Sequence, residues 1–124
     1  MSSNYSDNQP KFAVEFAKTA KDLRAAQRLR YDVFVKELGA GGPDVNHELQ
    51  LERDHFDDHA AHLLLRDMAR SDGDTVVGVY RLMTLEMAEN AGGFYCAQEF
   101  DLTPLSENGG KLLELGRSCL HPDY

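Results

Sequence analysis

Polar and apolar residues change their pattern about ten residues into the chain. The opening MSSNYSDNQP, residues 1–10, shows no apolar periodicity, which predicts a disordered tail. In the next stretch, KFAVEFAK, apolar residues occupy every second position, at Phe12, Val14 and Phe16. Alternation at period two is typical of a half-buried strand. The folded domain is therefore expected to span residues 11–124 and to open on this strand.

A long helix is predicted next, over AKDLRAAQRLRYDVFVKEL, residues 20–38. Its apolar positions recur at helical spacing and are Leu23, Ala26, Leu29, Val33 and Leu38. Thr19 stands just before the helix with Asp22 three residues on, an arrangement that satisfies the free amides of a helix N-terminus. Gly39 and the following AGGP are expected to end it.

The rest of the chain reads as an irregular segment followed by three strands. Residues 44–58 are mixed and polar, end in the acidic ERDHFDD, and predict an ordered loop or a short helical turn. HAAHLLLR and TVVGVYRLM predict two antiparallel strands, because DMARSDGD between them holds the turn-forming pair Asp72-Gly73. EMAENAGG predicts a short helical or loop excursion, and the closing strand is expected from Lys111 to about Leu120, after SENGG.

This order of elements is typical of an α/β or α+β domain with one mainly antiparallel sheet. A sheet of about four strands with one substantial helix leaves one face poorly covered. We therefore expect the chain to be the first half of a longer protein.

The composition of the chain excludes several classes of protein. A chain of 124 residues with 42% hydrophobic content fits one compact domain. Its net charge of -8 opposes nucleic-acid binding, which depends on Lys and Arg. The two cysteines, Cys96 and Cys119, form no disulfide framework, and neither a signal peptide nor an apolar run of membrane-spanning length is present. A cytoplasmic protein is expected, with peripheral contact to the inner membrane left open.

Charged residues interrupt the apolar closing strand. Side chains three apart in a regular strand point to opposite faces, so Glu114 and Arg117 can share one cleft only across a bulge, which Gly116 would permit. The alternative is that one charge faces solvent and the other is paired. Arg81 shares strand parity with apolar residues and needs a carboxylate partner. The acidic segment supplies candidates at Glu52, Asp54, Asp57 and Asp58.

Four blocks in order, LRYDVFVKELG, ERDHFDDHAAHLLLRD, VVGVYRLM and LLELGRSCLHPDY, resemble the autoinducer-synthase-like branch of the GNAT acyltransferases. More narrowly, they resemble the N-terminal half of the bacterial L-ornithine N-alpha-acyltransferases. The resemblance runs from about Phe12 to Tyr124. It implies a GNAT-like fold, a mainly antiparallel sheet flanked by helices, here ending after the central strand.

The resemblance also implies roles for individual residues. Arg30 and Phe34 match helix positions that shape the substrate cleft, and Asp54 and Asp57 match an acidic E-x-D-x-x-D pair. Arg81 matches the strand arginine. Glu114 with Arg117 matches the E-x-x-R of the central strand. These charges are expected to form one network along an acyl-transfer cleft.

The implied reaction moves a 3-hydroxyacyl chain from an acyl carrier protein thioester, or acyl-CoA, to the α-amine of L-ornithine, giving lyso-ornithine lipid without a bound cofactor. An ammonium group cannot attack a thioester, so a carboxylate must take its proton, and Glu114 is the candidate base. The arginines would hold Glu114 ionised and orient the substrate. A surface of charge -8 should repel an acidic carrier protein, so a basic docking patch must be local or lie in the missing half, and the 124 residues alone are expected to be inactive.

Alternatives remain open at this stage. The enzyme could be an acyl-homoserine-lactone synthase, although the chain lacks the tryptophan that this family carries after VF, or an acetyl-CoA-dependent N-acetyltransferase. A non-catalytic domain that binds acyl groups or a partner is the third reading. A covalent route through Cys96 or Cys119 lacks an adjacent histidine. His55, His59 and His62 could gather a metal only on a helix, and the expected strand scatters them, so no metal site is expected.

Overall fold

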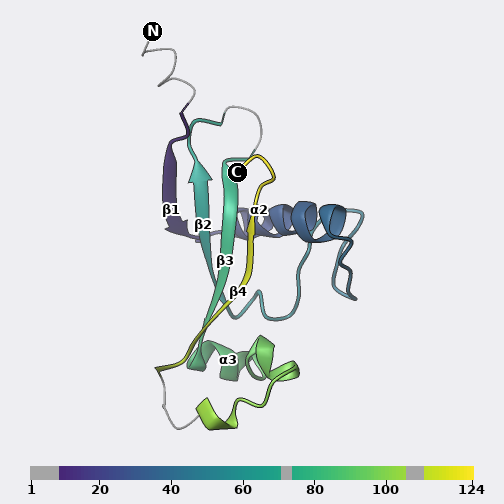
Figure 1. The fold of residues 1–124 in the computed structure, drawn as a ribbon, viewed down its shortest axis with the longest axis vertical. Coiled ribbons are helices and arrows are strands. Elements are labelled where there is room, and N and C mark those ends of the chain that lie inside the picture. The colour runs from purple at the N-terminus through teal and green to yellow at the C-terminus, as the bar shows by residue number, and fades with distance from the viewer. Residues whose placement is uncertain (1–8, 71–73, 106–110) are drawn as a thin grey trace.

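A four-stranded sheet organises the protein (Figure 1). The computed structural model describes residues 9–70, 74–105 and 111–124. The strands are β1 (Phe12–Phe16), β2 (Ala61–Asp67), β3 (Val76–Thr84) and β4 (Leu113–Leu120), in the order β1-β2-β3-β4. All three pairings are antiparallel, which confirms the four strands and the mainly antiparallel sheet expected from the sequence. Most of the predicted tail, the Asp72-Gly73 turn and SENGG lie outside the described residues.

The predicted long helix is present but changes type half-way. Helix α2 (Ala20–Arg30) continues directly into the π-helix η1 (Tyr31–Glu37). The Thr19 hydroxyl accepts a hydrogen bond from the amide of Asp22 at 3.1 Å, as the capping pattern predicts. Gly39 follows with φ +75, a conformation that glycine adopts at low cost. The wider π turn was not predicted, since helical periodicity does not distinguish it from an α turn.

Helix α2 lies across one face of the sheet and forms the main core with it (Figure 1). The core residues of the helices and strands are Ala25, Ala26, Leu29, Val33, Leu64, Val76, Val79 and Cys119. Helix α3 (Leu85–Ala91) and the 3-10 turn η2 (Tyr95–Gln98) follow the end of β3. They form a second cluster, whose buried members are Phe56, Met83 and Ala88. The helical excursion expected at EMAENAGG is α3.

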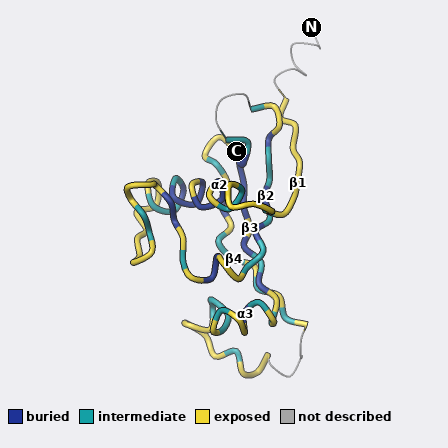
Figure 2. Tube along the Cα trace, turned by 180° about the vertical axis from the view of Figure 1, so that it is seen from behind, coloured by how far each residue is buried: buried dark blue, intermediate teal, exposed yellow. Residues whose placement is uncertain are grey.

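The opposite sheet face is open in the part of the chain that the structure describes. Val14 of β1 is 64% exposed, and Phe12 and Phe16 are also exposed (Figure 2). The cross-strand register places Val14 beside Leu65, on the side away from α2. The prediction of a half-buried first strand was therefore right for the strand and wrong for its burial, because its three apolar side chains stay more than half exposed even though the Phe12 ring contacts Tyr124. Among these residues, no helix is long and apolar enough to cross a membrane.

Candidate functional site

The acidic segment before β2 is held against the core helix by a backbone contact. The amide of Glu52 donates to the carbonyl of Gln27 at 3.0 Å, and Leu51 next to it is buried. Asn46 and Leu51 pair through both of their backbone groups, which closes the loop that precedes the contact. The side chain of Glu52 is consequently directed into the protein beneath α2, where only 7% of it is exposed.

Arg30 is the most deeply buried charge among the residues that the structure describes, with a side chain 1% exposed. Its guanidinium donates to the Glu52 carboxylate at 2.7 Å and to both oxygens of Asp57, at 2.9 and 3.1 Å. Buried charges cost several kcal/mol each unless such pairs compensate them. Because two carboxylates face it, the pKa of Arg30 is raised even though burial by itself would lower it.

Asp57 is the most heavily bonded carboxylate. Besides the two bonds from Arg30, it accepts one from the Gln27 amide at 2.9 Å and one from Arg81 at 2.9 Å. Burial would raise its pKa, but the Arg30 charge and the hydrogen bonds from Arg30, Gln27 and Arg81 hold the pKa of Asp57 below its usual value. The carbonyl of Asp57 also contacts the ring Nε2 of buried His62, at 2.9 Å. Asp57 therefore joins α2, β2 and β3.

Arg81 finds its partners in the acidic segment, as its strand parity predicted. One guanidinium nitrogen donates to Asp54 at 2.6 Å and to Asp57 at 2.9 Å. The guanidinium also lies over the rings of Phe56 and Tyr95, each 5.4 Å from the central carbon. Asp58, which the sequence offered as another partner, is exposed instead.

Strand β4 contains the bulge that the E-x-x-R spacing requires. Arg81 pairs with Gly116 and Val79 pairs with Cys119, so Arg117 and Ser118 together oppose a single β3 residue. Arg117 itself takes the left-handed conformation, with φ +47, and Gly116 does not. The bulge is therefore confirmed, and its left-handed residue is Arg117, next to the Gly116 that was expected to permit it. The bulge turns Arg117 toward the helix side, where its guanidinium reaches Glu52 and Asp54 at 3.3 and 3.8 Å.

Glu114 lies on the same face but has other partners. Its two oxygens accept hydrogen bonds from the backbone amides of Tyr95 and Cys96, at 3.1 and 2.8 Å, so the carboxylate caps the first turn of η2. No ion pair joins Glu114 to an arginine within residues 9–70, 74–105 and 111–124. The arginines were expected to hold Glu114 ionised within one network, but the hydrogen bonds to its carboxylate come from the amides of η2 instead.

Six side chains make up what we call the charge network: Arg30, Arg81, Arg117, Glu52, Asp54 and Asp57. Three guanidinium groups balance three carboxylates. Phe34 of η1 joins it through its ring, which lies 5.6 Å from the Arg117 guanidinium. Of the residues proposed from the sequence, the structure brings together Arg30, Phe34, Asp54, Asp57, Arg81 and Arg117, and places Glu114 beside them at Tyr95.

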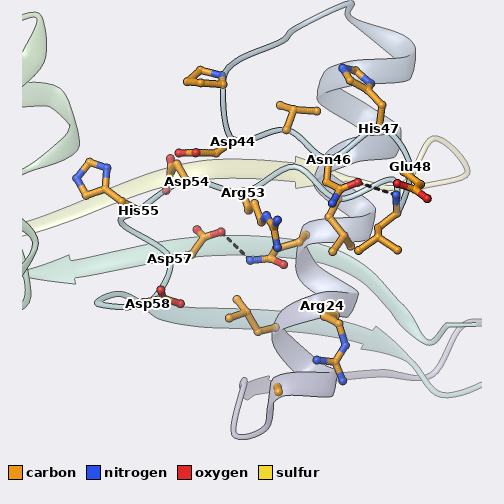
Figure 3. A pocket seen from close by; sticks show the side chains of 17 residues that line it. Arg24, Asp44, Asn46, His47, Glu48, Arg53, Asp54, His55, Asp57 and Asp58 are labelled. Carbon is orange, nitrogen blue, oxygen red and sulfur yellow. Dashed lines mark hydrogen bonds between the residues drawn. The ribbon is translucent and has the colours of Figure 1, made fainter.

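An open cavity of about 920 Å³ reaches the charge network from the loop side. Figure 3 shows Asp54, Asp57 and Asp58 along one side of this cavity, with His47 and Glu48 on the other. Acidic residues outnumber basic ones along its wall, because only Arg24 and Arg53 oppose five carboxylates. A small molecule carrying amino groups would be attracted to such a cavity.

The cysteines and histidines have other surroundings. A hydrogen bond to Glu114 and burial raise the pKa of Cys96 to about 11, and burial raises the pKa of Cys119 to about 11. Both thiols are therefore poor nucleophiles near neutral pH. Burial, together with the neighbouring Arg30 and Arg81, lowers the pKa of His62, although the contact with Asp57 acts in the opposite direction. Among the described residues, no three His, Cys, Asp or Glu side chains are placed to hold a metal ion.

Two residues that act on the charge network were not assigned to it from the sequence. Gln27 orients Asp57 and is buried in α2, one turn before Arg30. Its position among the apolar residues of the predicted helix could have indicated a buried polar contact. Tyr95 stacks on both Arg81 and Arg117, and nothing in its local sequence indicated this role.

Comparison with known proteins identifies the family. Residues 29–124, most of the chain, match the family described as acetyltransferase (GNAT) domain. The chain belongs to the GNAT acetyltransferase family. It is also 50% identical over 115 residues to the L-ornithine N(alpha)-acyltransferase of Rhodobacter capsulatus, covering 91% of this chain and 44% of that protein. The proteins of the same name from Brucella abortus and Rhizobium meliloti are 43% and 39% identical to this chain, each over 90% of it. The matched region covers 41% and 39% of those two proteins.

The chain thus spans less than half the length of these relatives. Among solved structures, the AHL synthase LasI superposes with a TM-score of 0.55 and 22% identity, over 91% of this chain and 55% of LasI. A likeness at this level of identity supports the fold, and it confirms the GNAT-like architecture expected from the sequence.

Proposed function

We propose that this chain forms the acceptor side of an N-acyltransferase that moves a 3-hydroxyacyl chain from acyl carrier protein to the α-amine of L-ornithine, giving lyso-ornithine lipid. The observation that carries the proposal is the 50% identity, over 91% of the chain, to an L-ornithine N(alpha)-acyltransferase. The charge network supports it independently, since a fixed set of opposite charges beside an acid-lined cavity suits an amino-acid acceptor.

The reaction would be direct aminolysis of a thioester. The α-ammonium first loses a proton to a base, and the amine nitrogen then attacks the thioester carbonyl carbon. A C–N bond forms, the C–S bond breaks, and the carrier thiol leaves with a proton. The raised pKa values of Cys96 and Cys119 disfavour an acyl-cysteine intermediate and favour this direct route.

Glu114 is the proposed base. Two backbone hydrogen bonds fix its carboxylate beside Tyr95, and Tyr95 in turn lies against Arg117 of the charge network. A base must be held within hydrogen-bond reach of the proton that it takes, and this capped position holds Glu114 rigidly at the edge of the network. Backbone amides beside the β4 bulge are candidates for stabilising the oxyanion that forms on the carbonyl.

The test uses the protein from its complete reading frame. It is incubated with 3-hydroxyacyl carrier protein and either L-ornithine or S-adenosylmethionine, and the products are followed by mass spectrometry. We expect N-(3-hydroxyacyl)ornithine and no acyl-homoserine lactone. Lack of transfer to ornithine, with turnover of acetyl-CoA and some other amine, would leave the fold intact and remove the proposed substrates.

A further inference from the structure

The guanidinium groups of the three arginines in the charge network differ in how many hydrogen bonds they make to carboxylates. Arg30 and Arg81 are almost completely buried and make hydrogen bonds of 2.6 to 3.1 Å to carboxylates. The side chain of Arg117 is 25% exposed, and its contacts with carboxylates among the described residues are ion pairs, at 3.3 Å to Glu52 and 3.8 Å to Asp54. Its buried Nε has no hydrogen-bond partner in the part of the chain that the structure describes. A guanidinium offers five N–H donors, so Arg117 retains donors for a ligand.

Two aromatic rings also contact the guanidinium of Arg117. The guanidinium carbon lies 5.2 Å from the ring centre of Tyr95 and 5.6 Å from that of Phe34. Aromatic contacts engage the flat faces of a guanidinium and leave the N–H groups at its edge available. The backbone of Arg117 is also held in a left-handed conformation, which costs about 1 kcal/mol or more for a residue other than glycine. Strain of this kind is retained where it positions a functional group.

Asp54, the more distant of the two carboxylates beside Arg117, is itself incompletely bonded. Oδ1 of Asp54 accepts a hydrogen bond from Arg81. Its buried Oδ2 has no hydrogen-bond donor among the described residues and lies 3.8 Å from Arg117. A buried carboxylate oxygen without a donor is unfavourable by about 1–3 kcal/mol. The pair thus presents an unused donor beside an unused acceptor. An α-amino acid carries the two complementary groups, carboxylate and ammonium, on one carbon.

We propose that Arg117 binds the α-carboxylate of the acceptor, which displaces Asp54 from it, and that this contact restricts the acceptors to free α-amino acids. The inference rests on the proposed function and adds to it a residue that selects the substrate. A carboxylate gives a guanidinium two parallel charge-assisted hydrogen bonds, which Asp54 does not reach in the structure described here. An amino-acid amide or a diamine offers no such group and would leave Arg117 unsatisfied.

The experiment compares L-ornithine with L-ornithinamide as acceptors for the enzyme from the complete reading frame, with 3-hydroxyacyl carrier protein as donor. Amidation also changes the reactivity of the amine, so the decisive quantity is the ratio of the two kcat/KM values in wild type against that ratio in Arg117→Gln. In wild type we expect ornithine to be favoured about 100-fold, mainly through KM. In Arg117→Gln this preference should fall to nearly onefold, because ornithine loses its contact while ornithinamide had none to lose.

A merely structural role for Arg117 gives a different pattern, since general damage lowers kcat/KM for both acceptors by the same factor. Equal use of both acceptors by wild type, or an unchanged ratio in Arg117→Gln, overturns the inference while the proposed function stands. Absence of any ornithine acylation by wild type instead overturns the proposed function, and the inference with it. If Arg117→Gln does not fold, the same ratio is compared between wild type and Arg117→Lys, which keeps the charge but loses the paired donors. A lower preference for ornithine in Arg117→Lys supports the inference, and an unchanged preference overturns it. Arg28→Gln, at an exposed arginine bonded to Asp74, is the control and should keep the wild-type ratio.

Discussion

Arg30 and Asp57, 27 residues apart in the chain, face each other through two parallel hydrogen bonds of 2.9 and 3.1 Å in the interior of the protein. This contact ties the core helix to the acidic segment, and Arg81 extends it to the sheet at the same carboxylate. The charge network therefore has a structural part, centred on Asp57, and a more open part at Arg117 and Asp54. The two parts predict different responses to substitution.

Asp57→Asn should destabilise the protein strongly. The substitution keeps the shape of the side chain but leaves Arg30 and Arg81 with one carboxylate fewer in a buried position, which costs about 3–5 kcal/mol. Urea unfolding followed by circular dichroism measures the change. Asp58→Asn, at the exposed neighbouring position, is the matched control and should stay within about 0.5 kcal/mol of wild type. Similar values for the two variants would contradict a structural role for Asp57.

The pH dependence of stability should carry a contribution from His62. Burial lowers the pKa of His62 in the folded protein, so the unfolded chain binds a proton more readily. The free energy of unfolding should then be highest above about pH 6.5 and fall as the pH decreases below that value, by up to about 1.4 kcal/mol per pH unit. Denaturant unfolding between pH 5 and 8 measures this slope.

His62→Gln should remove that part of the slope, because glutamine does not titrate. His59→Gln changes an exposed histidine three residues earlier and should retain it. A slope of the same size in both variants would show that another group is responsible.

Glu114→Gln should separate catalysis from folding. Glutamine can still accept a hydrogen bond from the start of η2, but it cannot take a proton from the acceptor amine. We expect acyl transfer by the complete protein to fall about 10²–10⁴-fold, with a loss of stability of only about 1 kcal/mol. Glu99→Gln, at an exposed glutamate just after η2, should keep full activity. Normal acyl transfer by Glu114→Gln would remove Glu114 as the base.

The two thiols should react slowly with electrophiles. With a pKa of about 11, Cys96 and Cys119 are almost entirely protonated at pH 7.5. Iodoacetamide labelling, followed by peptide mass spectrometry, should be about 100-fold slower than for free cysteine and should accelerate about tenfold for each pH unit up to pH 9.5. Rapid labelling of Cys96 at pH 7.5, or an acyl group trapped on it, would favour a covalent route.

The sequence predicted the elements of this fold well because their signals are local. Thr19 and Gly39 bound the helical segment as expected, and the alternation around Val14 located the first strand. Parity along β3 identified Arg81 as a charge that needs a partner in the acidic segment, and the structure supplies Asp54 and Asp57.

What the sequence could not provide depends on contacts between distant segments. Gln27 reaches Asp57 only because the acidic segment folds under α2, and Tyr95 reaches two arginines only because η2 folds beneath the sheet. Glu114 was expected to be held ionised by the arginines, but the amides of η2 donate to it instead, and no local pattern indicates where that turn falls.

The bulge in β4 shifts the alternation of side chains between the two faces of the strand by one residue. Before it, even-numbered residues such as Glu114 face the helix side, and after it odd-numbered residues such as Cys119 do. Deleting Ser118 would leave the pairs Arg81–Gly116 and Val79–Cys119 in register and place Arg117 opposite Tyr80, on the face away from Glu114. The two charges of the E-x-x-R spacing therefore stay on one face of β4 only while that extra residue is present.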